Sequence, residues 1–215
     1  MSRIDTLVMA NHARTAETSL LDTIKFNSTA VTDPATSAGG AAWSLFGYMQ
    51  AAGSGIRSRN RMTTNARLEG LFPEWLLNLL MLDLGRSDYE RSHTEAAARG
   101  LFNDAGINPT FYKDGPTTGT GQVFAAQTAG NLLPFPAATQ WALYPPGSWL
   151  FLDSGSLDLG IVRDSTLNST NDFQIFAETW EQAAFLGVET QWHTSTLYPN
   201  GTFSLGKDFS SSTGF

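Results

Sequence analysis

The sequence predicts a mixed α+β fold. Three observations support this: apolar residues recur at helical spacing in the middle of the chain, strand-forming residues crowd between proline-rich breaks further on, and loop, helix, strand and turn signals follow in order towards the C-terminus. The 215 residues suffice for one domain or two small ones, and 41% of them are hydrophobic, so the chain can bury a core.

The composition excludes several classes of protein. With 13 Lys and Arg against 20 Asp and Glu, the net charge of −7 argues against a general nucleic-acid binder. The absence of cysteine excludes disulfides, thiolate zinc sites and cysteine nucleophiles, and fits synthesis in a reducing cytoplasm. The first residues form no apolar run of signal-peptide length, and the apolar stretch 75–84 is too short to span a bilayer, so we expect no membrane partner.

Low charge combined with many aromatic residues leaves two explanations open. Only 15% of the residues are charged, yet the chain has 14 Phe, 6 Trp and 5 Tyr. These aromatic side chains either fill a core or cover surface that contacts other subunits.

The N-terminal part, residues 1–36, is expected to be an extended arm or hairpin. It is polar, rich in Thr, Ser and Asn, and contains only short β-prone pieces. The Asp33-Pro34 step then disfavours helical geometry, because proline restricts the residue before it.

Residues 37–100 are expected to be mainly helical. A first helix begins near residue 38, where Ala42, Leu45 and Met49 share one face, and Gly53 weakens or ends it. The leucine-rich stretch 71–86 predicts a second helix, and the stretch that follows predicts a third, reaching about residue 103.

The remaining chain divides into residues 101–170 and 171–215. Asn-Pro, Asp-Gly and Gly-Pro steps predict a loop over 108–122, and Pro145-Pro146-Gly147 predicts a turn before a buried strand at 148–155. In the last part, Asn171 or Asp172 is a good N-cap for a helix whose apolar stripe includes Trp180 and which ends at Gly187. Alternation over 188–198 predicts a strand.

No arrangement of side chains predicts a catalytic, cofactor or metal site. His12, His93 and His193 lack metal-ligand spacing, and His193 is expected to be a surface or packed side chain. The stretch 115–121 resembles a phosphate loop in composition but lacks the closing Gly-Lys-Ser/Thr. The order of residues leaves a Ser-His-Asp triad open, and Glu178 and Glu181 are explained by solvation as well as by catalysis.

The chain has one basic cluster. Its members lie within eleven positions and are Arg57, Arg59, Arg61 and Arg67. Such a cluster is usually a solvated face or a set of ion-pair partners, and the alternative is a surface that faces the phosphates of DNA.

Three stretches resemble major capsid proteins of tailed bacteriophages that infect actinobacteria. They are "GSWLFLDSGSLDLGIVRDSTLNSTNDFQIFAETWEQAAFLGVET", "RLEGLFPEWLLNLLMLDLGR" and "LFNDAGINPTFYKDG". The resemblance covers roughly residues 56–200, and "LGIVRDSTLNSTND" is its specific part.

The resemblance implies the Hong Kong-97-type capsid fold, with a peripheral domain holding a spine helix, an axial domain, an extended loop and an N-terminal arm. On this basis residues 1–36 correspond to the arm and extended loop, 37–100 to the spine helix and following helices of the peripheral domain, 101–170 to the axial domain, and 171–215 to a returning helix, strand and tail. At 215 residues the chain is short for such a subunit, so we expect a lost or trimmed arm or a reduced extended loop.

The implied function is a non-enzymatic capsid (head) protein of the virion, made in the host bacterial cytoplasm, that assembles into an icosahedral shell around phage DNA. Its partners would be further copies in hexamers and pentamers, with scaffold, portal or cement proteins and nonspecific contact with DNA, and no cofactor. The candidate assembly residues are Arg163, Asp164, Asn171 and Trp180, and the candidate DNA-facing residues are the four arginines of the basic cluster. Arg163 and Asp164 would form an ion pair that fixes a turn.

Three alternatives stay open. An encapsulin-like compartment uses the same fold to enclose cargo enzymes. Another virion component, such as a tail or decoration protein, would form rings, tubes or trimers. A hydrolase using the acidic loops is less favoured, because it needs a pocket that gathers several titratable groups with shifted pKa values.

Overall fold

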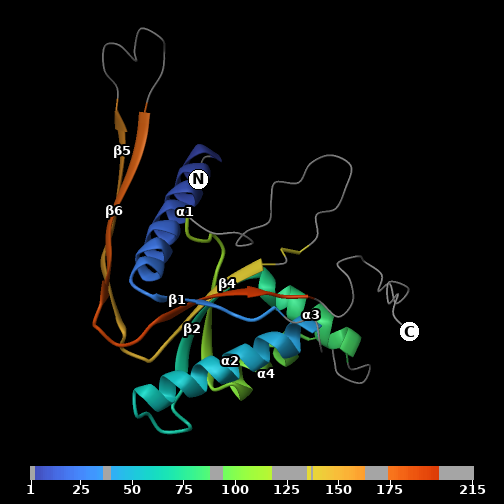
Figure 1. Ribbon diagram of the computed structural model, residues 1–215. Coiled ribbons are helices and arrows are strands. Elements are labelled where there is room, and N and C mark those ends of the chain that lie inside the picture. The colour runs from blue at the N-terminus through green and yellow to red at the C-terminus, as the bar shows by residue number, and fades with distance from the viewer. Residues whose placement is uncertain are drawn as a thin grey trace.

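The computed structural model describes residues 3–35, 40–87, 94–117, 135–136, 138–162 and 174–198 (Figure 1). The elements are α1 (Arg3–Phe26), β1 (Thr29–Thr32), α2 (Gly40–Arg59), β2 (Leu68–Pro73), α3 (Trp75–Ser87), α4 (Glu95–Asp104), β3 (Ile107–Tyr112), β4 (Ala138–Tyr144), β5 (Trp149–Val162), β6 (Gln174–Phe185) and β7 (Gln191–Thr196). The predicted α+β class is confirmed.

The described strands form a mixed sheet and a separate ribbon. The sheet has five strands in the order β1-β7-β4-β2-β3, with the outer pairs β1–β7 and β2–β3 parallel and the inner pairs antiparallel. The ribbon is the antiparallel pair β5–β6. Figure 1 shows α2, α3 and α4 on one side of the sheet, and α1 with the ribbon on the other.

Each face of the sheet therefore has its own apolar core. Strand β4 contributes to both, because successive side chains of a strand point to opposite faces. Trp141 packs into the larger core with helices α2, α3 and α4, whereas the adjacent Ala142 packs into the smaller one with Leu21 and Ile24 of α1. The sheet is thus covered on both faces, and polar side chains of its central strands, such as Gln140 and Ser195, are buried with hydrogen-bond partners.

Helix α2 begins against a carboxylate from α3. The buried Asp83 side chain accepts a hydrogen bond of 2.9 Å from the amide of Ala42, where the first amides of a helix lack partners inside it. Gly40 precedes it with φ +82°, and an added Cβ there would lie 2.6 Å from Asp83 Oδ2. A residue other than glycine would push this carboxylate away.

Much of the predicted secondary structure is confirmed. Helix α2 begins two residues after the predicted start and continues through Gly53 to Arg59. The second and third predicted helices correspond to α3 and α4, although residues 68–73 form strand β2 ahead of α3. The strand predicted over 188–198 is β7, and the turn at Gly147 precedes β5 as predicted.

Four predictions are wrong. Residues 3–26 form helix α1 instead of an extended arm, and residues 107–112 form strand β3 instead of a loop. Pro109 is tolerated there because β3 lies at the edge of the sheet. Residues 174–185 form strand β6 instead of a helix, because they pair with β5 on both sides of a register shift between Asp153 and Leu157. Strand β5 is largely exposed and runs to Val162, so the strand predicted as buried is half of a ribbon.

Candidate assembly surface

The β5–β6 ribbon extends away from the sheet as two paired strands of 14 and 12 residues (Figure 1). At its base Trp149 Nε1 donates to Thr190 Oγ1 at 3.1 Å, and the amide of Leu186 donates to the carbonyl of Ser148 at 2.9 Å. The rings of Trp149 and Phe185 lie 5.0 Å apart at the same level. These contacts fix the base of the ribbon to the sheet.

Helix α1 lies along the β6 half of one face of the ribbon. Thr179 and Ala183 of β6 line grooves together with α1, and Thr179 Oγ1 lies 3.0 Å from His12 Nε2. The groove between α1 and the middle of β6 has a volume of about 460 Å³ and is lined mainly by Thr, Ser and Ala side chains. Helix α1 thus supports the ribbon along this face, which we call the inner face.

The opposite face, which we call the outer face, has no cover among the described residues. It carries the even-numbered residues of β6 and their partners on β5, because side chains alternate along a strand. Trp180 is 73% exposed, and Leu150 and Leu152 are about half exposed. Phe176 lies over Gly160, where an added Cβ would be 2.2 Å from the ring. The outer face therefore exposes several apolar side chains, of which Trp180 is the most exposed.

Acidic residues stand opposite one another across the ribbon. Asp158 pairs in register with Glu178 on the outer face, and Asp153 pairs with Glu181 on the inner face. Like charges directly opposite on neighbouring strands are destabilising. Asp153 Oδ1 accepts from the amide of Gly155 at 2.8 Å, whereas Asp158 and Glu178 have no hydrogen bond or ion pair in the described part of the chain.

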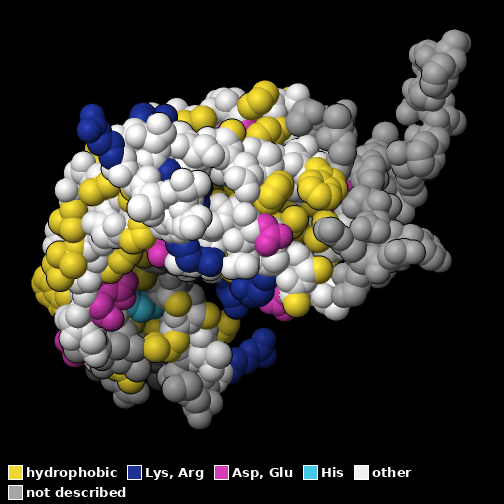
Figure 2. Space-filling model, turned by 90° about the horizontal axis from the view of Figure 1, so that it is seen from below, with side chains coloured by type: hydrophobic (Ala, Val, Ile, Leu, Met, Phe, Trp, Pro, Cys, Tyr) yellow, Lys and Arg dark blue, Asp and Glu magenta, His cyan; other side chains and the backbone are white. Residues whose placement is uncertain are grey.

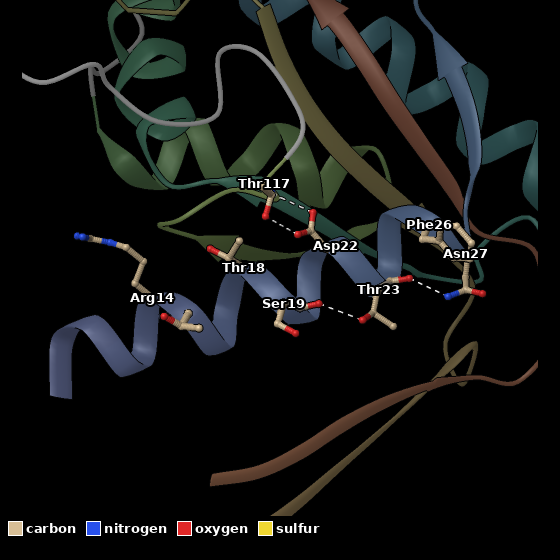
Figure 3. A pocket seen from close by; sticks show the side chains of 9 residues that line it. Arg14, Thr18, Ser19, Asp22, Thr23, Phe26, Asn27 and Thr117 are labelled. Carbon is tan, nitrogen blue, oxygen red and sulfur yellow. Dashed lines mark hydrogen bonds between the residues drawn. The ribbon is translucent and has the colours of Figure 1, made fainter. Parts of the chain in front are cut away.

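A second groove, of about 680 Å³, lies along α1 next to Thr117 (Figure 3). Figure 3 shows Asp22 accepting two hydrogen bonds from Thr117, at 2.9 Å from its amide and 2.6 Å from its hydroxyl. Thr23 donates to the carbonyl of Ser19 at 3.0 Å. The hydroxyls of Thr15, Thr23 and Thr117 thus donate to the Asn11 carbonyl, the Ser19 carbonyl and the Asp22 carboxylate, respectively.

The basic cluster is largely engaged within the protein. Arg57 is buried, and its guanidinium donates to the carbonyls of Ala66, Ala105 and Gly106 at 2.8–3.1 Å. Burial lowers the pKa of Arg57. Arg67 donates to Asn103 and Asn108 at 2.9 and 2.7 Å. These two arginines hold the turn after α2 against α4 and β3.

Arg59 and Arg61 lie at the surface. Arg59 pairs with Glu189 at 2.5 Å, and this hydrogen bond raises the pKa of Arg59 and lowers that of Glu189. Arg61 has a φ of 52° and no hydrogen bond or ion pair from its side chain among the described residues. Figure 2 shows the Lys and Arg side chains of this face in several separate groups. The DNA-facing role of the cluster stays a prediction, and Arg57 does not present a free guanidinium for it.

A buried polar network surrounds His193 in β7. Its Nδ1 lies 2.9 Å from Asp33 Oδ1, and its Nε2 lies 3.0 Å from the side-chain oxygen of Gln191. The Gln191 amide nitrogen donates to Glu189 at 2.6 Å, which turns the Gln191 oxygen towards His193. Both ring nitrogens thus lie within hydrogen-bond distance of a side-chain oxygen.

The same network places a serine beside this pair without forming a catalytic triad. Ser195 Oγ donates to Asp33 Oδ2 at 2.5 Å and accepts from Trp141 Nε1 at 2.7 Å, so it bonds the carboxylate and not the imidazole. The Trp141 and His193 rings stack with centroids 4.0 Å apart. Because all these side chains are buried, the network joins β1, β4 and β7, and the triad that the sequence left open is not formed here.

Of the predicted assembly residues, the structure places only Trp180, on the outer face. Arg163, Asp164 and Asn171 lie outside the described residues, so their roles stay predictions. The sequence analysis did not predict the ribbon, the Arg61 side chain without a partner among the described residues, or the Asp33–His193 pair. The pairing of Asp33 with a residue 160 positions later has no local signal in the sequence.

The described residues contain neither a metal-ligand cluster nor a membrane-spanning helix. No group of three or more His, Asp and Glu side chains in these ranges could hold a metal ion. In the same ranges, no helix combines the length and apolar character needed to cross a membrane.

Comparison with known proteins found similarity among solved structures. No family model matches the chain, and no curated protein matches it. One similar structure is titled Mycobacterium phage Che8, with 12% identity, a TM-score of 0.47, and coverage of 88% of this chain and 60% of that one. A second is the mature capsid of bacteriophage PhiM1, with 14% identity, a TM-score of 0.48, and coverage of 86% and 62%. A third is the capsid of cyanophage P-SCSP1u, with 10% identity, a TM-score of 0.49, and coverage of 91% and 66%.

The chain thus spans about three fifths to two thirds of the length of these solved chains. All three similar structures come from phages, and two of their titles name a capsid.

Proposed function

We propose that this chain is a capsid shell subunit, a structural protein that associates with further copies of itself to enclose phage DNA. The observation that carries the proposal is the outer face of the ribbon. Two isolated strands are marginally stable in water, and this ribbon also exposes Trp180 and several aliphatic side chains on a face that nothing described covers. Contact with neighbouring subunits would bury that face.

The sequence resemblance supports the same function, because its specific part, residues 159–172, begins in β5 and runs into the segment between the two strands. The low charge of the chain fits a protein whose surface is buried against many neighbours. A non-catalytic role in the virion, hexamers and pentamers as the assembly units, and scaffold, portal or cement proteins as partners all belong to this proposal.

The proposal also assigns the parts of the fold. We assign the axial domain to the five-stranded sheet with α2, α3 and α4, which share one apolar core. Helix α1 is the longest described helix and lies along β6, so it takes the role of the spine helix in a peripheral domain with the ribbon. This moves the proposed spine helix from residues 37–100 to α1.

The test is the assembly state of the purified chain. Multi-angle light scattering and negative-stain electron microscopy of one sample, over a range of concentration and salt, should show closed shells or rings of subunits. Nuclease treatment of particles recovered from cells then separates the proposed shell from a protein-filled compartment, because only the former should protect DNA. A chain that stays monomeric at every concentration and salt tested contradicts the proposal.

A further inference from the structure

The outer face of the ribbon carries two carboxylates that no described cation of its own chain neutralises. Asp158 and Glu178 stand opposite each other, and neither has a cationic partner among the described residues. Trp180 lies two residues from Glu178 on the same face, and Leu152 lies on the same face of the adjoining strand. A partner that fits this face must therefore bring a cation and tolerate an aromatic contact.

Most described cationic side chains are already engaged. Arg14, Arg59, Arg99 and Lys113 are paired with carboxylates, Lys25 donates to Gln140, and Arg57 and Arg67 donate to carbonyl or amide oxygens. Within the described side chains this leaves Arg3, at the start of α1, and Arg61.

Arg61 is the better candidate for an intermolecular contact, because hydrogen bonds fix the turn that carries it, whereas Arg3 lies on the first turn of a helix next to undescribed residues. The turn that carries Arg61 is fixed by hydrogen bonds from the Arg61 amide to the Ser58 carbonyl at 3.2 Å and from the Met62 amide to the Arg57 carbonyl at 2.8 Å. The described surface next to it, at Ser58, Thr63 and Thr64, is exposed and uncharged. No carboxylate of the turn itself competes for the guanidinium.

Arg61 and the acidic pair cannot meet within one molecule. Figure 1 places the turn after α2 at the lower end of the protein and the outer half of the ribbon at the upper end. Their contact must therefore join two copies through two different surfaces. Such head-to-tail contacts generate closed rings when the rotation between copies closes.

We propose that the outer face of the β5–β6 ribbon docks on the Arg61 turn, residues 58–67, of a second copy of this chain. The guanidinium of Arg61 lies between the carboxylates of Asp158 and Glu178 and against the indole of Trp180. A planar guanidinium suits this site because it can bridge two carboxylates and stack on an aromatic ring at the same time. The inference rests on the proposed function and names the surfaces that meet in the assembly.

The test is a charge exchange between the two surfaces. The variants are Arg61→Glu, the pair Asp158→Arg with Glu178→Arg, and all three changes together. We expect the first two each to raise the concentration for half-maximal assembly, measured by sedimentation velocity, at least tenfold. The triple variant should recover to within about threefold of the unmodified chain, since the opposite charges then meet again with reversed sign.

Matched controls separate this contact from general charge effects and from misfolding. Arg3→Glu removes the other free cation, and Asp104→Arg reverses an exposed acid at the end of α4. Both should assemble normally. Circular dichroism and thermal unfolding report folding, and the neutral pair Asp158→Asn with Glu178→Gln, which keeps the ribbon's shape, should show an intermediate loss. A photo-cross-linking residue at position 180 should label residues 58–67 of another copy.

The outcomes are distinguishable. If the unmodified chain assembles but Arg61→Glu assembles equally well, or if position 180 labels another segment, the docking inference is wrong and the proposed function stands. If Arg3→Glu impairs assembly and Arg61→Glu does not, the receiving surface is α1 and the inference is overturned. A chain that never assembles overturns both.

Discussion

Removing the carboxylate of Asp33 should destabilise the protein strongly, whereas replacing it by the isosteric amide should not. The Asp33 and His193 side chains are 7% and 2% exposed, and the carboxylate bonds both the imidazole and Ser195. Asp33→Ala leaves the buried His193 ring and the buried Ser195 hydroxyl without the carboxylate that bonds them. Hydrogen bonds to a charged group contribute about 1.5–3 kcal/mol each, so losing both should lower the free energy of unfolding by about 3–6 kcal/mol.

Asp33→Asn retains the shape and both hydrogen bonds. The new amide can donate to Nδ1 when the ring is in the tautomer with its proton on Nε2, and the amide oxygen still accepts from Ser195. Only the charge-assisted part of the bond is lost, so the cost should be about 1 kcal/mol. The two substitutions should thus differ by about 2 kcal/mol or more.

Urea unfolding of dilute protein near neutral pH, followed by tryptophan fluorescence, measures the difference, because Trp141 stacks on His193. The midpoint should fall and the slope with urea should stay unchanged. Asp104→Ala, at an exposed carboxylate, is the control and should have no effect. The reasoning about the network is refuted if Asp33→Ala costs less than about 1 kcal/mol, or if the two substitutions are equally damaging.

Three further predictions concern other parts of the molecule. Gly106→Ala should lower the free energy of unfolding by about 2 kcal/mol, because Gly106 has φ +70° and an added Cβ would lie 2.6 Å from Arg57 Nη2. Gly147→Ala is the control for backbone strain alone, since Gly147 has φ +80° and open space around it, and should lower the free energy of unfolding by about 1 kcal/mol. Equal melting temperatures of the two variants would contradict the Arg57 contact. The hydrogen bond from Arg59 lowers the pKa of Glu189, so this carboxylate stabilises the fold above its unfolded-state pKa and the contribution disappears as pH falls through the lowered value. Glu189→Gln should therefore cost about 1 kcal/mol near neutral pH and nothing in strong acid, and a pH-independent difference in urea midpoints would show that charge is not the cause. Replacing residues 151–184 by a short glycine turn should leave the thermal unfolding of the body nearly unchanged and abolish assembly in light scattering, whereas a body that unfolds would show that the ribbon supports the sheet.

The sequence predicted the parts whose burial has a local period. Leu45 and Met49 of α2 and the leucines of α3 face one core, so their spacing reports their environment. Helix α1 lacks this signal, because among its described side chains only Leu21 and Ile24 near its end are buried, and others such as Glu17 and Asp22 bond residues far along the chain. Its Thr, Ser and Asn content then suggested an extended segment.

Strand β6 shows why the candidate site was harder to predict than the helices. Phe176, Ala177 and Trp180 fit a helical stripe, but in the ribbon Ala177 faces α1 while Phe176 and Trp180 face away. Whether this segment forms a helix or a strand depends on its pairing with β5, and the residues of β6 alone do not report that pairing. The free arginine could not be identified for a similar reason, since the partners of Arg57, Arg59 and Arg67 all come from later in the chain.

The way the ribbon is attached at its base lets its length change without a change in the five-stranded sheet. Strands β4 and β7 are adjacent antiparallel partners in the sheet, and the ribbon is the connection between them. The chain leaves the body at Ser148 and returns at Leu186, where a backbone hydrogen bond joins the two positions. Paired residues can therefore be added to or removed from β5 and β6 together without changing the register of any strand in the sheet. The distance over which one molecule contacts another can thus change in steps of a residue pair while the same core is kept.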